Sequence, residues 1–159
     1  MKWTSMGKYF LLYFLIISCK NAHKNDFEKA RQEISRLEAD QKIYHLTKNA
    51  KLFTDLFSDH FLSVQKGLVD SPTRKQSLDR FENYFKKSEF IKWADSKQPI
   101  IRFSDDGSLA YVAVQKEVIV KFSESNGSQT RDTTYFAWMT IYKKYDTGWK
   151  IDCVVSTNK

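Results

Sequence analysis

The fold is decided by residues 99–155, which run PIIRFSDDGSLAYVAVQKEVIVKFSESNGSQTRDTTYFAWMTIYKKYDTGWKIDCVV. Within this stretch, Asp106-Gly107 and Asn126-Gly127 are typical of two-residue hairpin turns, and residues 146–148 (Asp-Thr-Gly) suit a three-residue loop. Long runs rich in β-branched and aromatic residues separate these turns. We therefore predict a meander of four antiparallel strands from Pro99 onward.

The turns also predict which side chains share a face, because residues paired across a ladder point to the same side of a sheet. The turn at 126–127 pairs Ser125 with Ser128, which would also bring Lys121 opposite Asp132. One predicted face is mostly aliphatic and carries Val112, Val114, Lys116, Val118, Tyr135, Met139 and Cys153. The other predicted face is amphipathic and carries Tyr111, Phe136, Trp138 and Tyr142.

Helical periodicity dominates the region that precedes the meander. Apolar residues recur at three- and four-residue steps, which predicts a helix over about 26–47, a break near Asn49 and a short helix over about 49–57. A short strand over 59–65 follows and ends at Gly67. Ser71-Pro72 is a favourable helix start, with Ser71 as the cap, and the next helix ends near Lys86-Lys87. The aliphatic face of the sheet is expected to pack on these helices.

The first 18 residues resemble a bacterial lipoprotein signal peptide. Lys2 and Lys8 precede an apolar run over 9–17, which is shorter than the roughly 20 residues of a membrane-spanning helix. The ending Ile16-Ile17-Ser18-Cys19 resembles a lipobox, in which the cysteine is acylated and becomes the first residue. We expect a signal peptide over 1–18, a lipidated Cys19 with a polar tether over 19–25, and one domain over 26–159. The resemblance implies a lipid-anchored, periplasm-facing protein of the cell envelope, and Lys20 favours an outer membrane where one exists.

Composition supports a single globular domain and argues against nucleic-acid binding. Hydrophobic residues make up 42% of the 159 residues and aromatic residues 15%, which is too apolar for a disordered chain. The formal net charge is +7, yet the lysines and arginines are scattered and form no basic block. The three histidines and two cysteines show no metal-ligand spacing, and no phosphate-binding loop or nucleophile elbow is present. We expect no metal and no cofactor, and we assign no catalytic residue.

Taken in order, these segments resemble the nuclear transport factor 2-like superfamily in its SnoaL-like branch of domains of unknown function. The match covers about residues 26–157 and depends on the SDDGSLAYV turn at 104–112 and the YKKYDTGWKI segment at 142–151. The resemblance implies an α+β cone, with N-terminal helices packed on a curved antiparallel sheet around a pocket. Members include isomerases, dehydratases, cyclases, dimerising modules and binding domains, so fold alone does not give the function.

Candidate pocket residues are those that we expect between the helices and the sheet. Lys116 is the anomaly among them, because a buried lysine can act as a base, a Schiff-base amine or an anion hook, unless the strand bulges or the side chain reaches out to solvent. The candidate pocket comprises Lys116, Tyr135, Met139, Tyr44 and Trp93. The candidate dimer face comprises Trp138, Phe136, Tyr111 and Tyr142.

Three function classes follow, and the first is favoured over the second because no set of carboxylates converges on the pocket. The first is a non-catalytic lipoprotein domain that binds a small apolar or amphipathic ligand or forms a homodimer. The second is the alternative, an isomerase, dehydratase or cyclase acting on a ring-bearing carbonyl compound. The third, a secreted immunity or toxin-partner protein, has no sequence feature in its favour. A carboxylate or histidine lining the pocket together with Tyr135 or Lys116 would favour the enzyme.

Overall fold

The computed structural model describes residues 7–123 and 127–158, with side chains described over 26–123 and 127–157. The helix α1 spans Gly7–Leu46, so its backbone runs through the residues expected to form the tether. The signal peptide over 1–18 and the acylated Cys19 concern side chains outside the described residues and stay predictions. Among the described helices, none is both long enough and apolar enough to cross a membrane.

Two helices follow α1 near the predicted places, although the first of them ends at Thr54 and not near residue 57, where the chain has already entered a strand. Asn49 caps α2 (Ala50–Thr54) by accepting a hydrogen bond from the Leu52 amide, which confirms the break near Asn49. The helix α3 spans Arg74–Lys87. Its cap is Thr73 and not the predicted Ser71, because Thr73 and Gln76 form a reciprocal capping box. The sequence Ser-Pro-Thr offers two hydroxyl residues, and only Thr73 has a glutamine three residues later.

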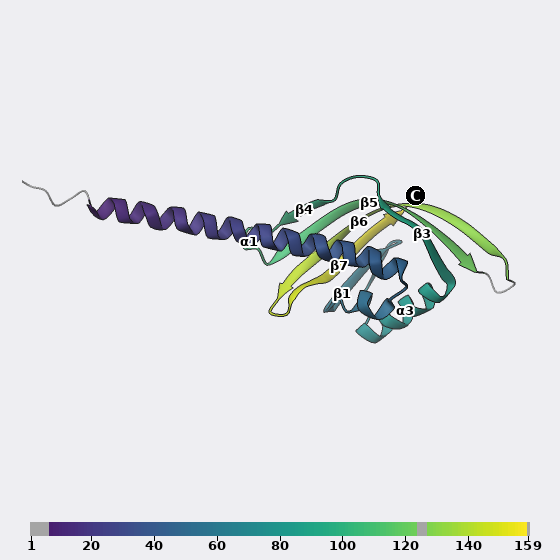
Figure 1. The fold of residues 1–159 in the computed structure, drawn as a ribbon. Helices are drawn as coiled ribbons and strands as arrows, with labels where there is room; N and C mark the ends of the chain where they lie inside the picture. The colour runs from purple at the N-terminus through teal and green to yellow at the C-terminus, as the bar shows by residue number, and fades with distance from the viewer. Residues whose placement is uncertain (1–6, 124–126, 159) are drawn as a thin grey trace, which may run out of the picture.

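Over the residues that the structure describes, a curved sheet of seven strands forms the other layer (Figure 1). Its strands are β1 (Phe57–Gln65), β2 (Leu68–Asp70), β3 (Ser88–Asp95), β4 (Ile100–Phe103), β5 (Leu109–Ser123), β6 (Gln129–Tyr145) and β7 (Gly148–Asn158). The order is β2-β1-β7-β6-β5-β3, and β4 also pairs with β5. The predicted meander of four strands is present, and β1 extends the sheet by pairing in parallel with β7. The sheet arches over the second half of α1, and α2 and α3 lie below it (Figure 1). This is the expected α+β cone-like fold, with a mixed sheet in place of a purely antiparallel one.

The predicted register is right for one hairpin and wrong for the next. Phe103 pairs with Ala110, as the Asp106-Gly107 turn predicts. Ser123 pairs with Gln129, however, in place of the predicted pairing of Ser125 with Ser128. A shift of one residue reverses the face of every following side chain. Lys121 consequently lies opposite Arg131 and not opposite Asp132.

This shift exchanges the two predicted faces of β6. The concave face, which faces the helices, carries Phe136, Trp138, Thr140 and Tyr142, opposite Lys116, Val114, Val112 and Ala110 of β5. Tyr135 and Met139 lie on the convex face. In β7, an irregularity around Asp152 returns Ile151 to the concave side, whereas Cys153 stays on the convex side beside Leu62 and Ile141. The loop after β6 also holds two residues and not three, because Tyr145 pairs with Gly148.

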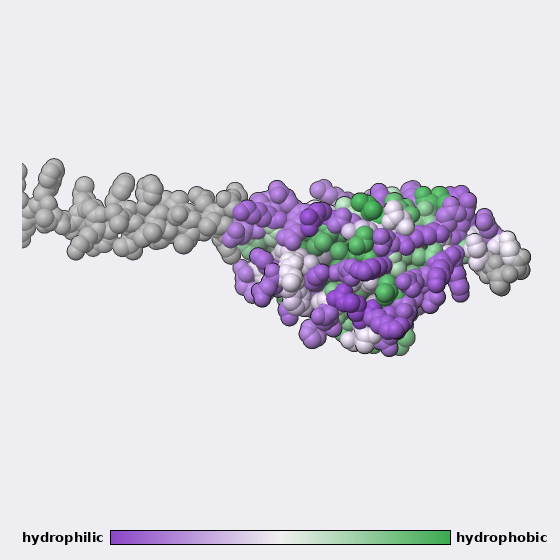
Figure 2. Space-filling model, turned by 60° about the horizontal axis from the view of Figure 1, so that its bottom comes forward, coloured by the Kyte–Doolittle hydropathy of each residue, from purple (hydrophilic) through white to green (hydrophobic). Residues whose placement is uncertain are grey.

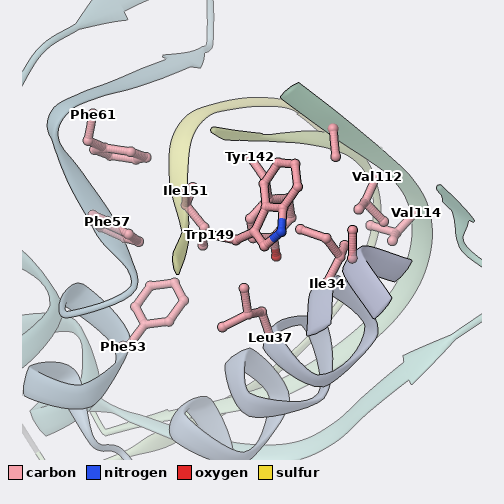
Figure 3. Close-up of a cluster of buried hydrophobic side chains, with 12 residues drawn as sticks. Ile34, Leu37, Phe53, Phe57, Phe61, Val112, Val114, Tyr142, Trp149 and Ile151 are labelled. Atoms are coloured by element: carbon pink, nitrogen blue, oxygen red, sulfur yellow. The ribbon is translucent and has the colours of Figure 1, made fainter. Parts of the chain in front are cut away.

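The main hydrophobic core fills the space between α1 and the sheet (Figure 3). Ile34 and Leu37 of α1 point toward Tyr142, Trp149 and Ile151 of the sheet, and all five side chains are buried. A row of three phenylalanines from α2 and β1, Phe53, Phe57 and Phe61, continues the core beside this cluster. Burial of such side chains contributes about 1.5–3 kcal/mol each to the stability. The core holds α1 in place and thereby fixes the residues that face the cavity described next.

Candidate ligand cavity

The strongest candidate site is a cavity of about 340 Å³ between α1, α3 and the concave face of the sheet. We call it the aromatic cavity, because its wall is formed largely by Phe53, Phe57, Phe61, Phe81, Trp93 and Trp138. Its volume is at the lower end of the roughly 300–1,000 Å³ typical of ligand pockets. Such a wall is suited to an apolar or ring-bearing molecule, since aromatic rings give large contact areas with little conformational freedom to lose.

His45 is the titratable group in the depth of this cavity. Its Nδ1 donates a hydrogen bond to the Gln41 carbonyl at 2.7 Å, because a carbonyl oxygen can only accept. The imidazole lies against the Trp93 ring, with 4.0 Å between centroids, and against Phe53 at 4.4 Å. Burial lowers its pKa from 6.5 to about 4. At neutral pH His45 therefore presents an uncharged ring to any ligand.

Arg80 of α3 carries the charge at the mouth of the aromatic cavity. Among the described residues that line the cavity, it is the sole side chain with a formal charge at neutral pH. Its guanidinium forms an ion pair with Asp70 of β2, and both side chains are about half exposed. Ser63 and Gln65 of β1 and Ser156 of β7 also line the cavity. The cavity thus has a largely aromatic wall and, toward α3, a cationic group that water can reach.

A second, polar cleft of about 440 Å³ is lined by residues from α1, by Asp95 and Lys116, and by residues just before β4. Lys116 lines this cleft and not the aromatic cavity. The β5 side chains on either side of it, Val114 and Val118, are buried with it, and only 4% of its surface is exposed. Its ammonium forms an ion pair with Asp95 of β3 and lies 5.5 Å from the centroid of the Trp138 ring. Lys116 is therefore buried as predicted, but as a paired charge.

A hydrogen-bonded group of three side chains joins α1 to β6 beside the polar cleft. The Tyr142 hydroxyl donates to Glu38 at 2.8 Å and accepts from the Gln41 amide at 2.8 Å. Burial raises the pKa of the Glu38 carboxyl, and the bond from Tyr142 partly offsets this. Burial and the neighbouring Glu38 raise the pKa of the Tyr142 hydroxyl well above 10. This group is positioned to hold α1 on the sheet, and its carboxylate does not line the aromatic cavity.

The structure separates the sequence-predicted site residues. Of the five candidate pocket residues, Trp93 lines the aromatic cavity, Lys116 lines the polar cleft, and Tyr44 packs against the core without lining the aromatic cavity. The prediction is wrong for the other two, Tyr135 and Met139, because the shifted register of β6 places them on the exposed convex face.

The candidate dimer face changes for the same reason. Phe136 and Trp138 line the aromatic cavity and Tyr142 is fully buried, so these three do not lie on an outer surface. Only Tyr111 remains on the convex face, where it is exposed.

The candidate pocket residues did not include Gln41, His45 or Arg80, which all line the aromatic cavity. Gln41 and His45 are four residues apart on α1 and therefore face the same way, a spacing that could have identified them as a pair. Arg80 stands between Asp79 and Phe81 of α3, and nothing in the local pattern marks it as a cavity residue. Among the described side chains, no group of three His, Cys, Asp or Glu is arranged to hold a metal ion.

Comparisons with known proteins place the fold without assigning a function. No family model matches the chain, and no curated protein matches it. Among solved structures it is similar to a nuclear transport factor 2-like protein from Cytophaga hutchinsonii, with a TM-score of 0.65 and 17% identity over 81% of this chain and 98% of that one. It is similar as well to a nuclear transport factor 2-like protein with a cystatin-like fold from Novosphingobium aromaticivorans, with a TM-score of 0.63 and 12% identity over 85% of each chain.

A third similar structure is a ketosteroid isomerase-like protein from Erwinia carotovora atroseptica, with a TM-score of 0.61 and 12% identity over 79% of this chain and 92% of that one. At these identities the likeness shows the fold alone. The chain therefore has the nuclear transport factor 2-like fold, with a curved sheet packed on N-terminal helices.

Proposed function

We propose that this protein is a lipid-anchored domain of the bacterial cell envelope that binds a small amphipathic molecule in its aromatic cavity. The observation that carries the proposal is the composition of the cavity wall. Aromatic rings from α2, β1, α3 and the sheet enclose a volume suited to a small molecule, and few polar groups interrupt them.

Binding is favoured over acid–base catalysis by the groups that face the cavity. Among the described residues that line it, none is a carboxylate, and Tyr135 and Lys116 both lie elsewhere. His45 does line the cavity, but a pKa of about 4 makes its imidazole a weak base at neutral pH. In the aromatic cavity, an isomerase or dehydratase would have to rely on this single weak base, since the carboxylates of Glu38 and Asp95 line the polar cleft with Lys116.

Blocking the cavity tests ligand binding directly. Ser156 of β7 lines the cavity, whereas Thr157 next to it is exposed and pairs with Ala137 on the convex face. We expect Ser156→Trp to abolish the binding of phenylbutanol, which combines an apolar ring with a hydroxyl group. Thr157→Trp adds the same bulk to the other face and should leave binding unchanged. Calorimetry on the full chain in nanodiscs of zwitterionic lipid, with empty nanodiscs as the blank, measures both. Equal phenylbutanol binding by the two variants would exclude the cavity as the site.

The lipid anchor has an equally direct test, because the chain has only two cysteines. Cells fed an alkyne-tagged fatty acid should label the wild-type protein and Cys153→Ala, while Cys19→Ala should carry no label. The expectation follows from the lipobox, which ends at Cys19, and from the burial of Cys153. Label retained by Cys19→Ala would contradict the anchor.

A second candidate role, homodimer formation, is favoured by the convex face of the sheet. Large apolar side chains there are exposed by 37–55%, and they come from β5, β6, β7 and β1: Tyr111, Tyr135, Met139, Val155 and Leu62. An extended patch of this kind marks an interaction surface. Because its residues point away from the cavity, the two roles are compatible.

A further inference from the structure

The described residues that line the aromatic cavity carry positive charge and no negative charge at neutral pH. Arg80 is the one charged side chain among the described lining residues, and the remaining polar groups are neutral at pH 7. Lysine or arginine beside an otherwise apolar wall attracts a ligand that carries a negative charge, because the charge is then paired while the apolar part leaves water. A cationic ligand would meet only repulsion from this guanidinium.

Arg80 already holds a carboxylate. Asp70, the last residue of the three-residue strand β2, forms an ion pair with it, and this contact links the sheet edge to α3. Asp70 pairs across the ladder with Ser63, which lines the cavity, so Asp70 lies on the same side of the sheet. Both partners are about half exposed, so the pair is weak and exchange with a second carboxylate costs little.

We propose that the ligand of the aromatic cavity is an amphipathic anion, with one carboxylate bound to Arg80 at the cavity mouth and an apolar body against the aromatic wall. Asp70 occupies one guanidinium nitrogen of Arg80 and competes for it, and the ligand carboxylate binds the donors that this ion pair leaves available. The inference rests on the proposed ligand-binding function and adds the charge and orientation of the ligand.

Three probes with the same body separate charge from apolar contact: phenylbutyrate, phenylbutanol and phenylbutylammonium. On the full chain in zwitterionic nanodiscs, calorimetry should show that phenylbutyrate binds about tenfold more tightly than phenylbutanol, since ion-paired hydrogen bonds are roughly twice as strong as neutral ones. Phenylbutylammonium should bind most weakly. Raising the salt concentration should narrow these differences.

Two substitutions should have opposite effects on the affinity for phenylbutyrate. Arg80→Gln should weaken phenylbutyrate binding about tenfold and phenylbutanol binding far less, and a far-ultraviolet circular dichroism spectrum equal to that of the wild type should show that the variant is folded. Asp70→Asn removes the competitor and should tighten phenylbutyrate binding several-fold. Two controls change the net charge by the same amounts away from the cavity: Lys75→Gln matches Arg80→Gln, and Asp79→Asn matches Asp70→Asn. Lys75 and Asp79 pair with each other on α3 and do not line the cavity, so each control should change the affinity less than twofold.

The outcomes distinguish this inference from the proposed function. If phenylbutanol does not bind, the proposed function fails and the anion inference fails with it. If phenylbutanol binds but phenylbutyrate binds no better, and Arg80→Gln alters neither affinity, the cavity binds ligands and only the anion inference is overturned. Tighter phenylbutyrate binding by Asp79→Asn, equal to that by Asp70→Asn, would also overturn it, because the effect would then be one of net charge.

Discussion

A buried histidine makes the stability of this domain depend on pH. The His45 imidazole has a pKa of about 4 in the folded protein and 6.5 ordinarily, so between these values the unfolded chain binds a proton that the folded chain excludes. The contribution of His45 to the free energy of unfolding is therefore complete above pH 6.5 and is lost as the pH decreases toward 4. The gap between the two pKa values corresponds to about 3 kcal/mol at most. Glu38 acts in the opposite sense, because its raised pKa favours the folded state at low pH and this contribution is lost as the pH rises.

Urea unfolding at a series of pH values measures this dependence. His45→Phe keeps an aromatic ring among Phe53, Phe85 and Trp93 and should flatten the loss of stability between pH 6.5 and 4. His60 is exposed, and His60→Gln should leave the wild-type slope in place. A slope that persists in His45→Phe would show that other groups cause the acid sensitivity.

At the scale of single elements, the N-terminus of α3 tests the corrected capping residue. Thr73 accepts a hydrogen bond from the Gln76 amide, and the Gln76 side chain accepts one from the Thr73 amide. Thr73→Ala should lower the free energy of unfolding by about 1 kcal/mol. Ser71, which the sequence pattern favours as the cap, makes only a long contact of 3.5 Å with the Phe61 carbonyl. Ser71→Ala should therefore cost clearly less in the same denaturant titration, and an equal or larger loss would contradict the capping box.

The elements that the sequence predicts correctly are those whose signals are local. Asn49 interrupts a helical stripe, and the Asp106-Gly107 turn fixes the register of β4 on β5. The register of β6 is wrong because the Asn126-Gly127 signal gives a turn but not its length, and one residue is enough to exchange the faces. The parallel pairing of β1 with β7 joins segments about ninety residues apart, so no turn between them could predict it. The cavity wall depends on both features, because the register of β6 turns Trp138 toward the helices and β1 contributes Phe57 and Phe61.

At the scale of the whole molecule, the corrected register moves the predicted dimer interface. The patch formed by Tyr111, Tyr135, Met139, Val155 and Leu62 covers the convex side of the sheet, opposite the cavity wall. Figure 2 brings forward the bottom of the molecule, where α2 and α3 lie, and that surface is mainly hydrophilic with separate hydrophobic areas, as is normal for a monomer face. A second copy packed on the convex patch would cover side chains from four adjacent strands without touching the cavity. We therefore expect a homodimer that binds one ligand in each subunit.

Sedimentation of the full chain in detergent of known mass tests this assembly. Met139→Asp places a charge at the centre of the patch and should convert dimers into monomers, since an unpaired charge is costly to bury in an interface. Ile43→Asp is the matched control, because Ile43 is an exposed apolar residue on α1 and should not affect the dimer. Trp138→Asp, by contrast, should impair phenylbutanol binding and leave the dimer intact, because Trp138 lines the cavity. A wild-type protein that sediments as a monomer, or a Met139→Asp protein that remains dimeric, would assign the convex patch to some other contact and leave the cavity proposal untouched.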